Sequence, residues 1–114
     1  MTQTQQVITA EKFQNAEQLW FWFLHSRAMR SNNFIRHRVT PTRRPCEILD
    51  VETLVTKLYL AGKLNDEHLS VMKTFGDRRR APHQHIWAEN RAANQWTCAM
   101  NILSAAAKQR GWIE

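Results

Sequence analysis

The chain has 114 residues, 43% of them apolar and 23% charged, which is enough for one domain with one core and excludes a disordered chain. Only three glycines and three prolines occur, so a turn-rich β-sandwich is excluded and an all-α domain of four helices is favoured. The formal net charge is +6, with 11 arginines against 5 lysines. This excess favours an anionic partner, either nucleic acid, an acidic protein or a membrane surface.

The cysteines and the apolar runs indicate the compartment. Cys46 and Cys98 have neither the number of a disulfide framework nor the spacing of zinc ligands, so we expect reduced core thiols. The polar residues 1–10 do not form a signal peptide, and the longest apolar run, Leu19–Leu24, is far too short to cross a bilayer. We therefore expect a cytoplasmic protein with no membrane partner.

The first predicted element is a helix over about residues 10–30. Residues 1–8 are rich in Thr and Gln and are expected to be a flexible N-terminus before a single helical domain, residues 9–114. Thr9 is the predicted N-cap of the first helix. Its run Leu19–Leu24, LWFWFL, covers every helix face, which predicts either a central helix or a dimer interface.

The middle of the chain is predicted to be a basic loop followed by a short helix. Residues 31–45 hold two prolines and four arginines and break the helical periodicity. A second helix is expected over about residues 47–61, with Asp50 as its N-cap and Gly62 just beyond its end.

Two further helices complete the predicted domain. Asn65 is the expected N-cap of a third helix over about residues 66–75, which Gly76 ends. The fourth helix is expected over about residues 82–110, because Pro82 is a favoured first helical residue.

The last two predicted helices have the layout of a DNA-binding helix-turn-helix. Arg78, Arg79 and Arg80 come just before Pro82, where a helix N-terminus already carries partial positive charge. Three cations at that position cost stability unless an anion lies nearby, and phosphate is the anion that helix N-termini bind. The run therefore predicts contact with nucleic acid.

Each candidate residue has a role in this arrangement. The side chains expected at base edges in the major groove are Arg80, His83, Gln84 and Trp87. Arginine can read guanine and glutamine can read adenine. The arginines expected to hold phosphates, which position the protein without reading sequence, are Arg43, Arg44, Arg78 and Arg79.

The segments Leu64–Gly76, LNDEHLSVMKTFG, and His85–Ala92, HIWAENRA, resemble the C-terminal promoter-binding region of bacterial sigma factors. In that family, a helix with acidic residues at its start ends in a hydrophobic residue followed by glycine. A recognition helix comes next, in which an aliphatic residue precedes a segment of an acidic residue, any residue, a basic residue and alanine. The resemblance covers about residues 64–92 and implies a helix-turn-helix fold and DNA binding. Residues 77–81 make the turn longer than is usual in that family, and Trp87 is bulky at the groove.

Catalytic and metal sites are not expected. His83, His85 and Glu89 lie close in sequence, but the two histidines are two residues apart and point in different directions, and no second cluster supplies further ligands. The serines lack a nucleophile motif, and no glycine-rich phosphate loop occurs. We therefore expect no metal, no cofactor and no enzymatic activity.

The run Arg78–Arg80 also has a plainer interpretation, in which it is an exposed, solvated turn whose charge Asp77 partly neutralises.

The sequence thus predicts a small basic DNA-binding protein, most simply a transcriptional regulator. Dimerisation through the first or the last helix would match a two-fold operator. The alternative is a non-catalytic helical adaptor, in which LWFWFL is the hot-spot patch for an acidic protein partner and the arginines are its polar rim. Non-specific RNA binding is a third hypothesis, which the sequence does not separate from these.

Overall fold

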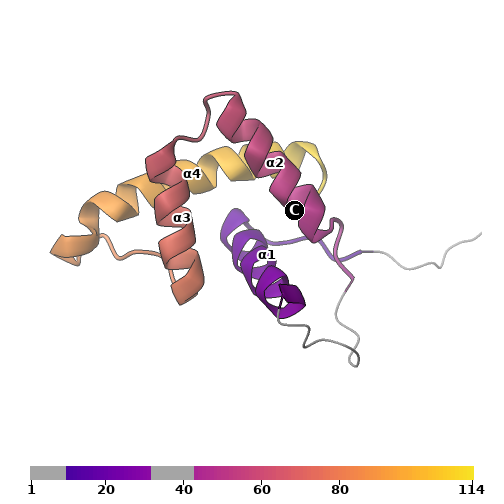
Figure 1. Ribbon diagram of the computed structural model, residues 1–114, viewed down its shortest axis with the longest axis horizontal. Coiled ribbons are helices and arrows are strands. Elements are labelled where there is room, and N and C mark those ends of the chain that lie inside the picture. The colour runs from indigo at the N-terminus through magenta and orange to yellow at the C-terminus, as the bar shows by residue number, and fades with distance from the viewer. Residues whose placement is uncertain (1–9, 32–42) are drawn as a thin grey trace, which may run out of the picture.

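The computed structural model describes residues 10–31 and 43–114 and confirms the all-α fold class (Figure 1). In these ranges the α-helices are α1 (Ala16–Ser31), α2 (Ile48–Leu60), α3 (Asp66–Arg78) and α4 (Asn90–Gln109), and a 3₁₀ turn, η2 (Trp87–Glu89), precedes α4. The same ranges contain no β-strand, only an isolated bridge between Phe13 and Ile113. The predicted flexible N-terminus, residues 1–8, and residues 32–42 of the predicted basic loop lie outside the described residues.

The longest helix, α4, is the element on which the others are assembled. It runs across the view in Figure 1, and both α1 and α3 pack against it, while α2 packs on α1. The core draws buried side chains from all four helices, for example Leu19, Leu54, Met72 and Leu103. None of the helices described in the two ranges is long and apolar enough to cross a membrane.

The first helix begins later than predicted. Asn15, not Thr9, is its cap, because the Asn15 Oδ1 accepts a hydrogen bond from the Gln18 N–H at 2.8 Å. Phe13 is held in the extended bridge, where its N–H donates to the Trp112 carbonyl at 2.9 Å. A residue in that pairing cannot join a helix, so the predicted start near residue 10 is wrong. Thr9 itself lies outside the described residues.

The run Leu19–Leu24 lies at the centre of the core. Four of its six side chains are buried, and the other two, Phe21 and Trp22, pack on the core. Phe21 stacks on Trp96 with ring centroids 5.8 Å apart, and the ring of Trp22 lies 5.2 Å from that of Phe13. The prediction of a central helix is therefore confirmed, and the interpretation of this run as an exposed hot-spot patch is wrong.

The second helix is capped one turn earlier than predicted. Glu47 occupies the N-cap position, and Asp50 caps it from inside the first turn, where its Oδ2 accepts from the Glu47 N–H at 2.8 Å. Gly62 has φ +79°, a left-handed conformation that glycine adopts without strain, and it follows the end of the helix as predicted.

The third helix is capped as predicted but continues through its glycine. The Asn65 Oδ1 accepts from the His68 N–H at 2.8 Å, and the His68 Nδ1 accepts from the Asn65 N–H at 3.1 Å. Gly76 does not end α3. It lies inside the helix against α1, where an added Cβ would lie 2.8 Å from Trp20 Nε1 and would overlap Leu24. This glycine permits close helix packing rather than a turn.

The fourth helix begins at Asn90, so its predicted start at Pro82 is wrong. Pro82 is buried in a loop, and Glu89, expected in the second turn of that helix, folds back to accept from the His83 N–H at 2.8 Å. A helix over these residues would place residues 83 and 89 about 9 Å apart along its axis, so this contact is incompatible with the predicted helix. Cys98, expected in the core, is exposed on α4, whereas Cys46 is buried.

Candidate nucleic-acid interface

The arginine run lies at the C-terminus of a helix, not at an N-terminus as predicted. Arg78 is the last residue of α3, and Arg79 follows it with φ +59°. A helix C-terminus carries partial negative charge, so cations placed there stabilise the helix. Contrary to the prediction, this run therefore does not require a nearby anion. Residues Arg79–Glu89, which include η2, form the loop between α3 and α4 and are called the 79–89 loop below.

Arg78 and Arg79 are exposed beside this loop. The Arg78 guanidinium lies 4.9 Å from the centre of the Phe75 ring, and the Arg79 Nη2 donates to the Nδ1 of His25 at 2.6 Å. In the ranges that the structure describes, neither arginine pairs with a carboxylate. Both guanidiniums therefore keep donors directed to solvent, where an external anion can reach them.

Arg80 is bound within the loop by Glu89. Its Nη1 and Nη2 donate to the two carboxylate oxygens of Glu89 at 3.0 and 2.7 Å. The hydrogen bonds from Arg80, and then the one from the His83 N–H, lower the pKa of Glu89 to about 2. The pair closes the loop, and the predicted contact of Arg80 with a base would require the pair to open.

Gln84 forms a second connection between the loop and α4. The Gln84 side-chain Nε2 donates to the Oδ1 of Asn94 at 3.2 Å, and the Gln84 backbone carbonyl accepts from the Nδ2 of Asn90 at 2.9 Å. Together with the Arg80–Glu89 pair, these bonds fix both halves of the loop, so its exposed side chains are held in defined positions.

Trp87 is the most exposed large side chain of this surface. It is 92% exposed, and its neighbour Ile86 is 42% exposed. The nearby rings of His83 and His85 are also exposed and lie 5.7 Å apart. No group of three metal-ligating side chains occurs in the described part of the chain. An exposed indole beside imidazoles on an ordered loop is suited to contact with a partner surface.

The structure adds a face of α4 that the sequence reasoning missed. Asn90, Asn94, Thr97 and Asn101 are exposed and recur at the spacing of one helix face. The sequence of α4 contains no carboxylate. Beside this face, the guanidinium of Arg91 is bound by Glu67 through contacts of 2.7 and 3.0 Å. The spacing of the asparagines was visible in the sequence, because residues 90–101 lie within the predicted helix, but only the structure shows that this face is exposed.

The structure separates Arg43 and Arg44 from the other candidates. Arg44 lies over the ring of Phe13 at 4.4 Å, and the Arg43 carbonyl accepts from the Glu11 N–H at 2.8 Å. Phe13 pairs with Ile113, beyond the C-terminus of α4, whereas Trp87 precedes its N-terminus. A helix of 20 residues is about 30 Å long, so one rigid surface patch does not combine the two groups.

Comparison of the chain with protein-family models, with curated proteins and with solved structures finds no match. The resemblance of residues 64–92 to sigma factors therefore stays a prediction. Within that segment, the structure corrects the expected helix ends: Gly76 lies inside a helix, and Ile86 lies in the loop before one.

Proposed function

We propose that this protein is a small, non-catalytic DNA-binding protein of the cytoplasm that docks the N-terminal half of α4 and the 79–89 loop on duplex DNA. The observation that carries the proposal is the composition of this surface. It exposes guanidinium, imidazole, amide and indole groups, and the carboxylates within it are bound to its own cations.

The local charge balance supports an anionic partner. Asp77 pairs with Lys73 at 3.0 Å, Glu89 with Arg80 at 2.7 Å, and Glu67 with Arg91 at 2.7 Å. Each acidic group is thereby neutralised within the protein. Arg78 and Arg79 have no such carboxylate partner among the described residues, so the net field at this end is positive.

The proposed docking differs from the one that the sequence predicted. The asparagine face of α4 takes the base-reading role, because asparagine can pair with the major-groove edge of adenine. Asn90 and Asn94 release their hydrogen bonds to Gln84 when they make such a pair. Arg78 and Arg79 hold phosphates, and Trp87 packs on the backbone beside the groove. Arg80 acts indirectly, because its pair with Glu89 holds the loop that carries Trp87. A homodimer on a two-fold site is part of this proposal.

The test is fluorescence anisotropy with a mixed-sequence duplex at about 50 mM and about 200 mM salt. The double variant R78A/R79G removes both phosphate contacts, and it should bind about tenfold more weakly and lower the log–log salt slope by about 2. The matched control is K57Q/K63Q, which removes the same charge far along the molecule and should bind DNA nearly as the parent does.

Two results would contradict the proposal. Equal losses in R78A/R79G and K57Q/K63Q would show that net charge alone determines binding. Tighter binding to single-stranded DNA or to RNA of the same sequences would assign the surface to those ligands, since exposed indoles also stack on unpaired bases. Circular dichroism spectra of both variants establish that the helices persist.

A further inference from the structure

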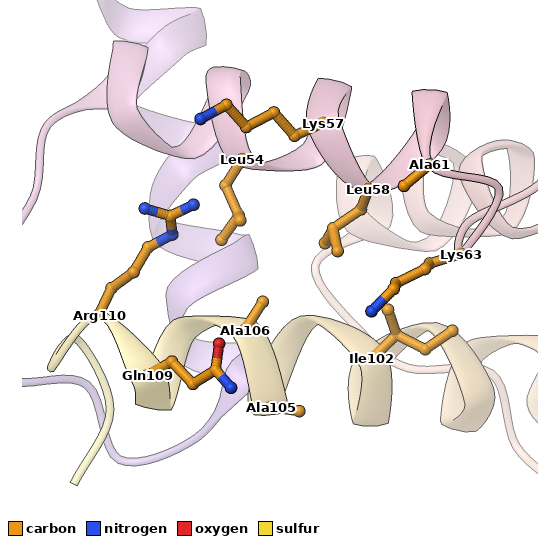
Figure 2. A pocket seen from close by; sticks show the side chains of 10 residues that line it. All are labelled: Leu54, Lys57, Leu58, Ala61, Lys63, Ile102, Ala105, Ala106, Gln109 and Arg110. Carbon is orange, nitrogen blue, oxygen red and sulfur yellow. The ribbon is translucent and has the colours of Figure 1, made fainter.

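A groove lies between α2 and α4, at the end of α4 opposite the 79–89 loop (Figure 2). Its volume is about 650 Å³. The groove exists because α2 packs on α1, whereas α4 packs on α1 and α3, so the two helices flank a gap that their side chains do not fill. The loop and this groove are separate surfaces, because residue 90 and residue 105 of α4 are about 22 Å apart along the helix axis.

The floor of the groove is apolar and made by short helical rows. Leu54 and Leu58, four residues apart, line it from α2, and Ile102, Ala105 and Ala106 line it from α4. Because the side chains of the two alanines are short, the backbone of another segment can approach α4 closely. Rows of side chains spaced by three and four residues form the kind of surface into which the ridge of a further helix fits.

The rim of the groove is positively charged. Among the described residues that line it, the charged ones are Lys57, Lys63 and Arg110, and none is a carboxylate. All three are exposed, and none takes part in an ion pair in residues 10–31 and 43–114. Figure 2 shows Lys57 and Arg110 near one end of the groove and Lys63 at the other. An occupant must therefore be apolar along its middle and anionic along its edges.

We propose that this groove binds an acidic amphipathic helix of a partner protein. Positively charged side chains lie at both ends of the apolar floor, so the groove is complementary in charge to a helix that carries acidic residues beside its apolar face. A groove that opens to solvent along its side encloses a small molecule poorly, whereas a helix-in-groove contact needs only one face of the ligand to be covered. The proposal does not depend on DNA binding, because it uses none of the residues assigned to that surface.

The probe is a synthetic amphipathic peptide of about 18 residues, which forms about five helical turns, with leucine and alanine on one face and glutamate along its edges. Its partner probe has glutamine in place of every glutamate. Amide chemical shifts of the full-length protein, labelled with ¹⁵N, locate the peptide. We expect the glutamate peptide to shift amides of residues 54–63 and 102–110 and to leave residues 83–91 unchanged.

Charge reversal then tests the rim. The variant K57E/K63E should bind the glutamate peptide about tenfold more weakly, since each exposed pair contributes about threefold and reversal adds repulsion. The control K12E/K108E has the same net charge, and its two exposed lysines lie outside the groove. It should change the affinity by less than about twofold.

Several outcomes would overturn the proposal. One is equal binding of the glutamine peptide, and another is shifts confined to other residues. A third is binding of decanoate, a small amphiphilic anion, in the groove when the peptide does not bind. A fourth is a homodimer that dissociates only in K57E/K63E, which would make a second copy of the chain the occupant. Failure of DNA binding in the anisotropy test leaves each of these measurements intact.

Discussion

Arg80 and Glu89 hold each other through two nitrogen–oxygen contacts of 3.0 and 2.7 Å, across nine residues of chain. The same carboxylate accepts from the His83 N–H, so one acidic side chain organises the whole segment before α4. This arrangement keeps residues 82–88 out of the helix that they were expected to start. It also makes the position of Trp87 depend on the charge of Glu89.

We predict that the contribution of Glu89 to stability is lost in acid. Hydrogen bonds from Arg80, and then from the His83 N–H, lower its pKa from 4.5 to about 2. The folded protein therefore holds the carboxylate more strongly than the unfolded chain, and the contribution is complete above pH 4.5 and disappears as the pH falls through about 2. Melting temperatures of the parent and of Glu89→Gln should differ at neutral pH and converge in this interval. A constant difference down to pH 2 would contradict the assignment.

We predict that Gly76→Ala destabilises the protein, although alanine is the better helix former. The added methyl group would meet Trp20 and Leu24 of α1, and overpacking of this kind costs about 1–3 kcal/mol. Denaturant unfolding measures the loss. Gly76→Ala should cost less when it is introduced into Leu24→Ala than into the parent, because the methyl then has room. An increase in stability on Gly76→Ala would show that α1 and α3 do not approach as closely as described.

We predict that Arg79→Gly stabilises the fold and that Arg79→Ala does not. Arg79 has φ +59°, where a side chain costs about 1 kcal/mol and glycine is unstrained. Both variants lose the contact with His25 and one charge, so their difference isolates the backbone conformation. The comparison requires unfolding curves at one pH. Equal stabilities would mean that residue 79 is not left-handed in solution.

We predict that the two thiols differ sharply in reactivity. Burial, and then the nearby charge of Asp50, raise the pKa of Cys46 to about 12, whereas Cys98 is exposed on α4. Iodoacetamide at about pH 8 should modify Cys98 in the native protein and Cys46 only after unfolding, because the thiolate is the reactive form. Mass spectrometry of peptides identifies the modified site. Because the pKa of Cys46 is raised, its contribution to stability should decline between pH 9 and about 12.

The sequence predicts the structure correctly where neighbouring residues alone determine it and no long-range contact opposes them. The cap at Asn65 and the chain reversal at Gly62 depend on neighbouring residues alone, and both are confirmed. The central position of Leu19–Leu24 also follows from its composition, because a helix that is apolar all round must be buried.

The errors arise where a distant contact overrides the local signal. Pro82 has the properties of a first helical residue, but Glu89 folds back onto Arg80 and the His83 N–H, and a helix starting at Pro82 would hold these groups too far apart. Gly76 resembles a terminator, yet it is required by the approach of α1, which is far away in sequence. The groove between α2 and α4 could not be predicted, because no single segment carries both of its walls.

The bridge between Phe13 and Ile113 joins residues that are 100 positions apart in the chain. Closing a loop of that length costs entropy that a pair of hydrogen bonds does not repay, so the bridge has to wait until the helices between its two halves have assembled. It should accordingly form late in folding. Formation of this bridge thus indicates that the helices between Phe13 and Ile113 have assembled.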